Sequence, residues 1–291
     1  MTTAPGGTTV RPAATAAAAL TATYRRLAAA CDALNVRIAR ADTAAVEATP
    51  PGVHLGGAEL ARSPEALDAL IEAEATRLRE RHGHDPRADV AAALALHGYL
   101  WSVSLLMSGP WYLERRVPRV QREEVRLDLA TGAYHIVPGT GFACLPGDRA
   151  ADLPGVRVVA DEEALRAELR TAVADHIRPL LTAIGPRMRR GPRALWGTAT
   201  DDLVSGIWYL GRMLGQEDRA VRAATELLPG GIPPFPGGAG FRRLAGRHGD
   251  RYPTRTRISC CTYYTLDSAQ ECLTCPRTCD AERLRRLENG S

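Results

Sequence analysis

The stretch Val90 to Leu113 reads VAAALALHGYLWSVSLLMSGPWYL and contains no aspartate, glutamate, lysine or arginine. By length alone it is able to cross a bilayer, which takes about 20 apolar residues. Its many alanines, the histidine at position 97 and the Gly109-Pro110 pair favour a buried helix instead, and proline should end that helix early. We therefore expect a core helix over about Arg87 to Met107 and no integral membrane span.

Helices are also predicted on both sides of this stretch, because apolar residues recur there at helical spacing. Ser63-Pro64 is a good helix start, since serine caps the first N–H groups and proline fits the first turn. The other predicted helices cover residues 23–45, follow the capping residue Asp161, and begin at Thr200-Asp201-Asp202.

The middle of the chain changes to the two-residue period of a strand. Apolar and charged residues alternate over 125–129, and Tyr134 and Ile136 resume the alternation after the turn sequence ATGA. This pattern is typical of a β-hairpin, and GVRVVA at 155–160 is a further candidate strand. We therefore expect an α+β fold, mainly helical, with a small mid-chain antiparallel sheet and a C-terminal cysteine-rich cluster-binding segment.

Composition divides the chain into three parts. Residues 1–20 have neither the basic start nor the apolar core of a signal peptide, so a flexible N-terminal tail is expected there. Residues 21–240 are expected to form the helical α+β body, with the hairpin near 124–137. The sequence LLPGGIPPFPGGAG ends this body, and residues 241–291 form the cysteine-rich segment.

All 37 basic residues are arginine, and with 33 acidic residues the formal net charge is +4. Residues 241–291 contain ten arginines and six acids, so this segment carries the whole surplus. Such a surplus suits an acidic protein partner, an anionic ligand or an anionic cluster. It is too small to indicate a nucleic-acid partner.

The stretch Ser259 to Asp280, SCCTYYTLDSAQECLTCPRTCD, holds five of the seven cysteines. Closely spaced cysteines in a chain expected in the cytoplasm indicate a metal or redox site, because the cytosol keeps thiols reduced. Cys272 and Cys275 form a C-x-x-C pair, whose thiolates reach one metal across a tight turn. Cys260 and Cys261 point to opposite sides of an extended backbone, which a two-iron cluster accommodates because each thiolate need only reach the nearer iron. A single zinc ion held by the same four thiolates and a vicinal disulfide are the alternatives.

The spacing C-C-x10-C-x2-C resembles the C-terminal signature of the FhuF-like ferric siderophore reductases. The preceding RTRIS and, more loosely, the upstream ALWGTATDDLVSGIWYLG resemble the same family. The resemblance implies a [2Fe-2S] cluster whose cofactor and metal ligands are Cys260, Cys261, Cys272 and Cys275. It also implies one-electron reduction of a ferric siderophore, which releases iron because oxygen ligands hold Fe(III) better than Fe(II).

The three remaining cysteines lie outside this pattern. Cys279 is an extra thiol close to the motif, which leaves the identity of the fourth ligand open. Cys31 and Cys144 are far from it in the sequence and are expected to be ordinary buried thiols. Arg255, Arg257 and Arg277 are expected either to raise the potential of an anionic cluster or to be solvated surface charges.

Motifs for a resident nucleotide or flavin are missing from the sequence. No G-x-G-x-x-G follows a predicted strand, and no G-x-x-x-x-G-K-[ST] occurs. A reductase of this kind needs an external electron donor, such as a ferredoxin or a similar reductase. A cytoplasmic oxidoreductase is therefore expected, and a zinc-stapled binding protein without redox activity is the alternative.

Overall fold

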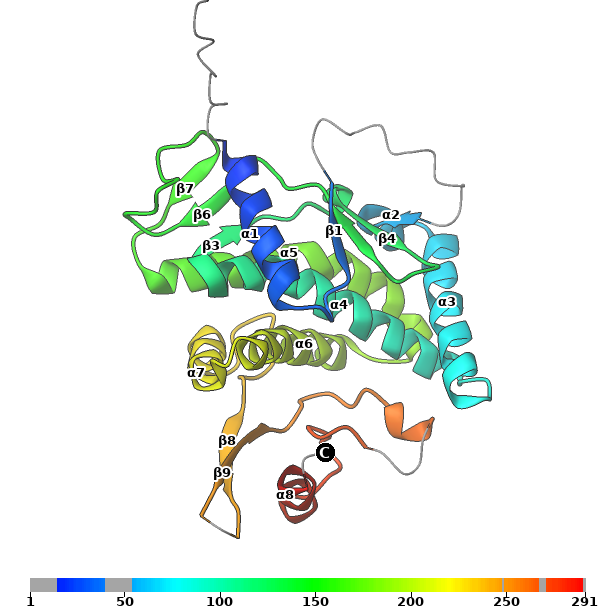
Figure 1. The fold of residues 1–291 in the computed structure, drawn as a ribbon. Helices are drawn as coiled ribbons and strands as arrows, with labels where there is room; N and C mark the ends of the chain where they lie inside the picture. Colours follow the sequence, from blue (N-terminus) through cyan, green and yellow to red (C-terminus); the bar gives the residue numbers. More distant parts are fainter. Residues whose placement is uncertain (1–14, 40–53, 248, 267–270, 290–291) are drawn as a thin grey trace, which may run out of the picture.

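The computed structural model describes residues 15–39, 54–247, 249–266 and 271–289 (Figure 1). Its helices, of which η2 and η3 are short 3-10 helices, are α1 (Ala16–Ala30), α2 (Gly57–Arg62), α3 (Pro64–His82), α4 (Ala88–Glu114), η2 (Arg122–Glu124), α5 (Glu162–Met188), α6 (Pro192–Met213), α7 (Glu217–Leu227), η3 (Tyr263–Thr265) and α8 (Asp280–Glu288). Its strands are β1 (Val36–Ile38), β2 (His54–Gly56), β3 (Arg116–Pro118), β4 (Val125–Asp128), β5 (Tyr134–Ile136), β6 (Phe142–Cys144), β7 (Val156–Val158), β8 (Phe241–Ala245) and β9 (Arg251–Arg255). The predicted α+β fold, mainly helical with small sheets, is confirmed.

Helix α4 is the central element of the fold and packs against α1, α3, α5 and α6. Almost all of its residues from Val90 to Tyr112 are buried. By length and composition α4 qualifies as a candidate membrane span, but other helices of the protein cover its apolar surface. The prediction that this stretch forms a core helix is confirmed.

The predicted end of this helix at Gly109-Pro110 is wrong, because α4 continues through Pro110 to Glu114. Proline removes one helical N–H group and crowds the preceding turn. The next two residues, Trp111 and Tyr112, are fully buried, and burying two large aromatic side chains offsets that cost. The helix ends where Arg115 adopts a left-handed conformation and its N–H group donates to the carbonyls of Pro110 and Trp111.

The strands in the middle of the chain form two small mixed sheets. β4 and β5 are the predicted antiparallel hairpin, with Val125 opposite Ile136. β1 extends this sheet in parallel beside β5, and β2 pairs with β4 on the other side. The predicted strand at 155–160 is β7, which pairs in parallel with β6 in a separate sheet of order β3-β6-β7. The single antiparallel sheet of the prediction is therefore replaced by two sheets with parallel pairs.

The first helix begins earlier and ends earlier than predicted. α1 starts at Ala16, where the Thr15 hydroxyl accepts a hydrogen bond from the Ala18 N–H at 3.1 Å, so it includes the end of the stretch 1–20 assigned to a flexible tail. After α1, residues 36–38 form β1, because alternating β-branched side chains favour a strand and β5 offers a partner. The rest of the predicted tail, 1–14, and residues 40–45 of the predicted helix lie outside the described residues.

Helix α6 begins at Pro192, well before the predicted start at Thr200-Asp201-Asp202. Proline at the first helical position is the true start signal. The three polar residues lie in the middle of α6 and are fully buried. They were misread because such residues usually mark a helix start, where their side chains cap free N–H groups.

The cysteine-rich segment lies along α6, on the side away from α4 and α5 (Figure 1). It contains the β8–β9 hairpin, η3 and the C-terminal α8. Its Leu266 packs into an apolar cluster with Leu78 of α3 and Leu94 of α4. The segment is thus attached to the body through α6 and through the ends of α3 and α4.

Candidate metal centre

The four cysteines of the C-C-x10-C-x2-C motif come together in the structure. The Cys272 thiol donates a hydrogen bond to the Cys261 sulfur, which lowers the pKa of Cys261 and raises that of Cys272. Cys275 lies near enough to both Cys260 and Cys272 for its charge to act on their thiols. Two arms of the chain, 260–261 and 272–275, therefore bring four thiols to one place.

Cys31 follows α1 and Cys144 lies in β6, so both are outside the cysteine-rich segment, as expected. Cys31 and Cys144 are buried, and burial raises the pKa of each thiol. Cys279 is exposed at the start of α8, in the N-cap position.

Local backbone geometry around the sulfur atoms suits thiolate ligands. The Cys275 N–H donates to the Cys272 carbonyl at 2.9 Å, which closes the C-x-x-C turn. The Thr262 N–H donates to the Cys260 sulfur at 3.4 Å, and the Arg277 N–H donates to the Cys275 sulfur at 3.5 Å. Hydrogen bonds of this kind stabilise negative charge on metal-bound sulfur.

The spacing of the four sulfur atoms bears on which centre they fit. Among the described residues, no three of these sulfurs lie within 4.8 Å of one another. Four thiolates around a single zinc ion at Zn–S distances of about 2.3 Å would all lie about 3.8 Å apart. In the described part of the structure only Cys261 and Cys272 form a close pair, so the four sulfurs are spread more widely than in a filled four-thiolate zinc site.

Arg283 of α8 holds the C-x-x-C loop in place by hydrogen bonds to its backbone. This residue was not identified from the sequence. Its side chain is 1% exposed. Its Nε donates to the Leu273 carbonyl at 2.9 Å, and its Nη2 donates to the carbonyls of Cys275 and Thr278 at 2.8 and 3.1 Å. A planar guanidinium with several donors suits this task, because it satisfies three carbonyls of one tight loop at once.

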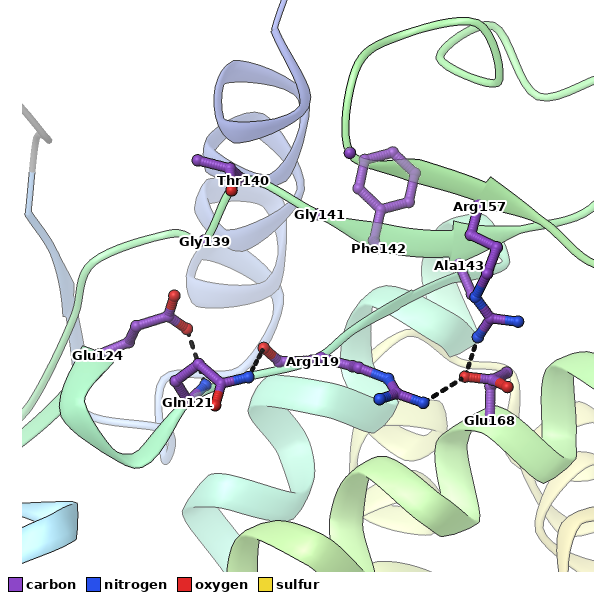
Figure 2. A pocket seen from close by; sticks show the side chains of 11 residues that line it. Arg119, Gln121, Glu124, Gly139, Thr140, Gly141, Phe142, Ala143, Arg157 and Glu168 are labelled. Carbon is purple, nitrogen blue, oxygen red and sulfur yellow. Dashed lines mark hydrogen bonds and ion pairs between the residues drawn. The ribbon is translucent and has the colours of Figure 1, made fainter.

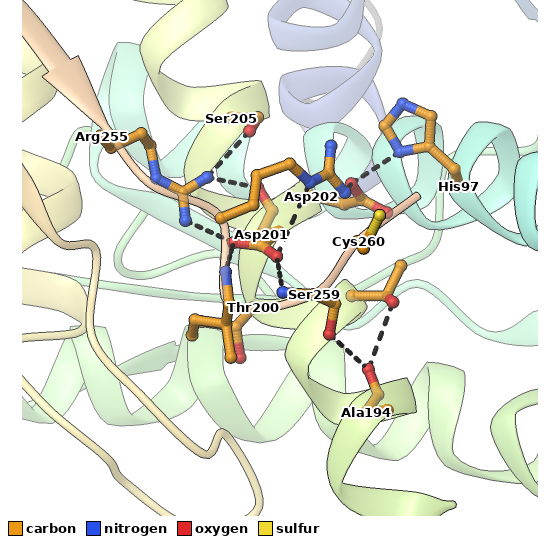
Figure 3. Close-up of polar contacts among 12 residues, drawn as sticks. His97, Ala194, Thr200, Asp201, Asp202, Ser205, Arg255, Ser259 and Cys260 are labelled. Atoms are coloured by element: carbon orange, nitrogen blue, oxygen red, sulfur yellow. Dashed lines mark hydrogen bonds and ion pairs between the residues drawn. The ribbon is translucent and has the colours of Figure 1, made fainter. Parts of the chain in front are cut away.

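The first arm of the cysteine segment is bound by Asp201, in the middle of α6 (Figure 3). Its carboxylate accepts hydrogen bonds from Arg255 Nη2 at 2.6 Å, from the Ile258 N–H at 3.0 Å and from the Ser259 N–H at 2.8 Å. Both Asp201 and Arg255 have no exposed surface. One buried carboxylate thus holds the backbone immediately before Cys260.

Asp202 forms a second buried contact beside the first. Its Oδ1 accepts a hydrogen bond from Arg257 Nη2 at 3.0 Å and lies 2.7 Å from His97 Nδ1 of α4 (Figure 3). The Asp202 carboxylate raises the pKa of His97. The Arg257 backbone N–H donates to the Thr274 carbonyl at 2.9 Å, so this residue joins α6 to the C-x-x-C loop.

These contacts decide between the two expectations for the arginines near the ligands. Arg255 and Arg257 are buried and paired, so they are not solvated surface charges. Arg257 lies close enough to Cys261 and Cys272 for its charge to act on both thiols. Arg277 is exposed and lies over the Tyr264 ring at 4.4 Å.

A second set of possible metal ligands lies in the sheet, away from the cysteines. One ligand atom each from His54, Asp128 and His135 lies within 4.8 Å of the others. The Asp128 carboxylate, however, already accepts bonds from the Ala130 and Thr131 N–H groups and from the Thr131 hydroxyl. The hairpin turn accounts for this carboxylate, and the set is not part of the candidate centre.

Cavities also lie in the helical body and beside the cysteine segment. One of about 680 Å³ lies between the end of α5 and the start of α6, and one of about 290 Å³ is bordered by Arg257 and Thr274. The third, of about 250 Å³, lies beside β6 and α5 (Figure 2). In that cavity Arg119 and Arg157 both pair with Glu168, and Glu124 also lines it, so two carboxyl groups accompany the two arginines.

Sequence reasoning therefore found the four thiols but missed the groups that position them. Asp201 and Asp202 belong to ALWGTATDDLVSGIWYLG, and Arg255 and Arg257 belong to RTRIS, so the two stretches quoted for the resemblance contact each other. No protein-family model matches the sequence, and a comparison with curated proteins finds no match either.

Proposed function

We propose that this protein is a ferric siderophore reductase whose four motif cysteines hold a [2Fe-2S] cluster. The observation that carries the proposal is the meeting of four thiols from two separate arms, with backbone N–H groups directed at two of the sulfurs. The arms are held by buried groups, Asp201 on one side and Arg283 on the other. Because buried hydrogen-bonding groups fix the position of both arms, the site is suited to a permanently bound cofactor.

Such a cluster, when bound, supplies reversible transfer of one electron. The chain's own residues set how readily the centre accepts negative charge. Arg257 and the N–H groups of Thr262 and Arg277 place positive charge and hydrogen-bond donors near the thiolates. These groups stabilise the more negative, reduced state and so raise the potential.

The substrate of the proposed reaction is Fe(III) held by the oxygen atoms of a siderophore. One electron converts Fe(III) to Fe(II), which hard oxygen ligands hold less tightly. The Fe(II) then dissociates from the siderophore, and protons from water bind to the oxygen atoms that had held the iron. Release of iron for use by the cell fits a cytoplasmic location.

The electron donor of the proposed reaction is a separate protein, such as a ferredoxin or a similar reductase, because the sequence has no nucleotide or flavin motif. The sequence indicated an acidic donor because residues 241–291 carry a surplus of four positive charges. The ion pairs in the structure weaken that argument. Three of the ten arginines of this segment pair with aspartates of the body, Asp201, Asp202 and Asp218, which leaves a surplus of one. The surface near the cysteines therefore gives no strong electrostatic reason for a particular donor.

Anaerobic purification tests the proposal, followed by an absorption spectrum and by assays of iron, acid-labile sulfide and zinc. We expect a red-brown protein with iron and sulfide in equal amounts, bleached by dithionite and reoxidised by a ferric siderophore but not reduced by NADPH alone. A colourless protein with one zinc would favour the zinc-stapled alternative. Failure of every ferric chelate to reoxidise the reduced protein would remove the reductase assignment.

Cysteine variants assign the ligands in the same assay. Cys272→Ser should abolish the visible spectrum, because it removes the sulfur in closest contact with Cys261. Cys279→Ser is the matched control in the same segment and should keep the spectrum, because that thiol is exposed at the start of α8 and lies outside the C-C-x10-C-x2-C motif. Loss of colour in Cys279→Ser alone would make Cys279 a ligand in place of one of the four.

A further inference from the structure

The cavity of about 680 Å³ lies between the last turns of α5 and the first turns of α6. Its volume falls within the range of about 300–1,000 Å³ that is usual for small-molecule sites. Apolar walls come from Leu181, Leu195 and Trp196, and polar groups from Arg178, Arg189 and Arg190. Among residues 15–39, 54–247, 249–266 and 271–289, no aspartate or glutamate lines it.

The three arginines of this cavity form no close ion pair with any described residue, although Arg189 is near enough to Asp89 to contribute to the lowered pKa of that carboxyl. Arg178 lies over the Trp196 ring at 5.2 Å. In the part of the chain that the structure describes, none of the three pairs with an acidic side chain, whereas the neighbouring Arg187 binds Asp68. The cavity of Figure 2 differs, because Glu168 pairs with both of its arginines and Glu124 lines it as well. Unneutralised guanidinium groups around an apolar pocket favour an anionic ligand.

The wall of this cavity adjoins the candidate metal centre. The Ser259 hydroxyl donates to the Ala194 carbonyl at 2.7 Å, which places the next residue, Cys260, over the first turns of α6 (Figure 3). Arg190, Gly191, Pro192 and Leu195 all line the cavity, so Ala194, which Ser259 contacts, lies within the chain segment that forms the cavity wall.

We propose that this cavity binds the ferric chelate and selects chelates with a net negative charge, of the catecholate or carboxylate class. The inference rests on the proposed function, because it places the substrate of that reaction beside Cys260. A cluster held by the four cysteines would supply one electron to Fe(III), giving Fe(II) and a chelate one charge more negative, and the external donor protein would replace that electron. The arginines neutralise the charge that the chelate carries and gains.

Binding of gallium complexes to the full chain tests this site, because Ga(III) is not reduced and binding is then measured apart from electron transfer. The probes are the trianionic tris(catecholate) complex and the neutral tris(benzohydroxamate) complex, which both carry three aromatic, oxygen-donor ligands. By titration calorimetry we expect the trianion to bind at least about tenfold more tightly than the neutral complex. Equal affinities would overturn the proposal.

A double variant locates the binding. Arg189→Asn with Arg190→Gln removes two charges, and asparagine tolerates the left-handed conformation of residue 189, where φ is 52°. The matched control, Arg149→Gln with Arg222→Gln, removes two charges from exposed positions that do not line the cavity. We expect at least about a tenfold loss of trianion affinity in the first variant and less than about a twofold change in the second. Equal losses would overturn the site.

The two proposals fail in different ways. If the purified chain lacks iron but the trianion binds and the cavity variant abolishes that binding, the anion site stands and the reductase does not. If the iron-containing protein reduces neutral and anionic chelates equally well, and the cavity variant does the same, the reductase stands and this site is refuted.

Discussion

At the scale of single residues, the most unusual group is Asp201, a carboxylate without solvent exposure in the middle of a helix. It is stabilised by Arg255 and by two backbone N–H groups of the segment before Cys260. Burying a charge is costly unless it is paired and hydrogen-bonded. Here the pairing also determines where the first cysteine arm lies.

Asp201→Asn should therefore be strongly destabilising, because it leaves the Arg255 guanidinium buried without a counter-charge. We expect the free energy of unfolding to fall by about 3–5 kcal/mol. Asp218→Asn is the control, since its pair with Arg243 is exposed and such pairs contribute at most about 1 kcal/mol. Urea unfolding of both variants measures the difference, and similar losses would show that the buried pair has no special role.

At the scale of elements, α6 brings the cysteine segment against the body through a close contact at Gly197. A Cβ atom at this position would lie 2.3 Å from the Ser259 hydroxyl and 3.5 Å from the Ser259 Cβ. The absence of a side chain allows Ser259 to reach the Ala194 carbonyl. The helix thus provides both hydrogen-bond acceptors at Asp201 and space for the segment 258–260 that Asp201 holds.

Gly197→Ala should push the Ser259 hydroxyl away from α6 and move Cys260 with it. We expect faster loss of iron to an external chelator from this variant than from the wild type. Gly98→Ala in α4 is the matched control, because a Cβ atom there meets no other atom within 4 Å. That change should leave iron retention unaltered and stabilise the helix by about 0.5–1 kcal/mol. Unchanged iron release from Gly197→Ala would mean that the contact with Ser259 is dispensable.

At the scale of the whole molecule, α4, α5 and the loop after β3 are joined by the buried His176. Its Nδ1 lies 2.9 Å from the Val120 carbonyl, and its Nε2 lies 3.0 Å from the Tyr99 hydroxyl. Burial lowers the pKa of His176 to about 4. The body of the protein is therefore built around a neutral imidazole.

This histidine should make the fold sensitive to acid. Its pKa is depressed on folding, so the full stability is present above the unfolded value of about 6.5 and is lost as the pH falls toward 4. At about pH 5 the expected loss from this one group is about 2 kcal/mol. Urea unfolding at about pH 7.5 and about pH 5 measures it, and His176→Asn should lose that part of the pH dependence. The same slope in the variant would assign the effect to other groups.

Features that depend on neighbouring residues were readable from the sequence. The apolar run of α4, the alternation of β4 and β5 and the Ser63-Pro64 start of α3 were each predicted correctly, because burial and capping leave a local pattern. The spacing of the cysteines likewise identified the four thiols that meet.

Contacts between distant segments were decided only by the tertiary structure. Asp201 follows the pattern of a helix start, and its role appears only when Arg255, far along the chain, is packed against it. The hydrogen bonds from Arg283 to the C-x-x-C loop and the cavity that Arg190 lines also depend on contacts between separate elements, which no local sequence pattern predicts. A buried charge is stable only where an oppositely charged or hydrogen-bonding group contacts it. The sequence gives the residue types, but it does not give which distant residues come into contact.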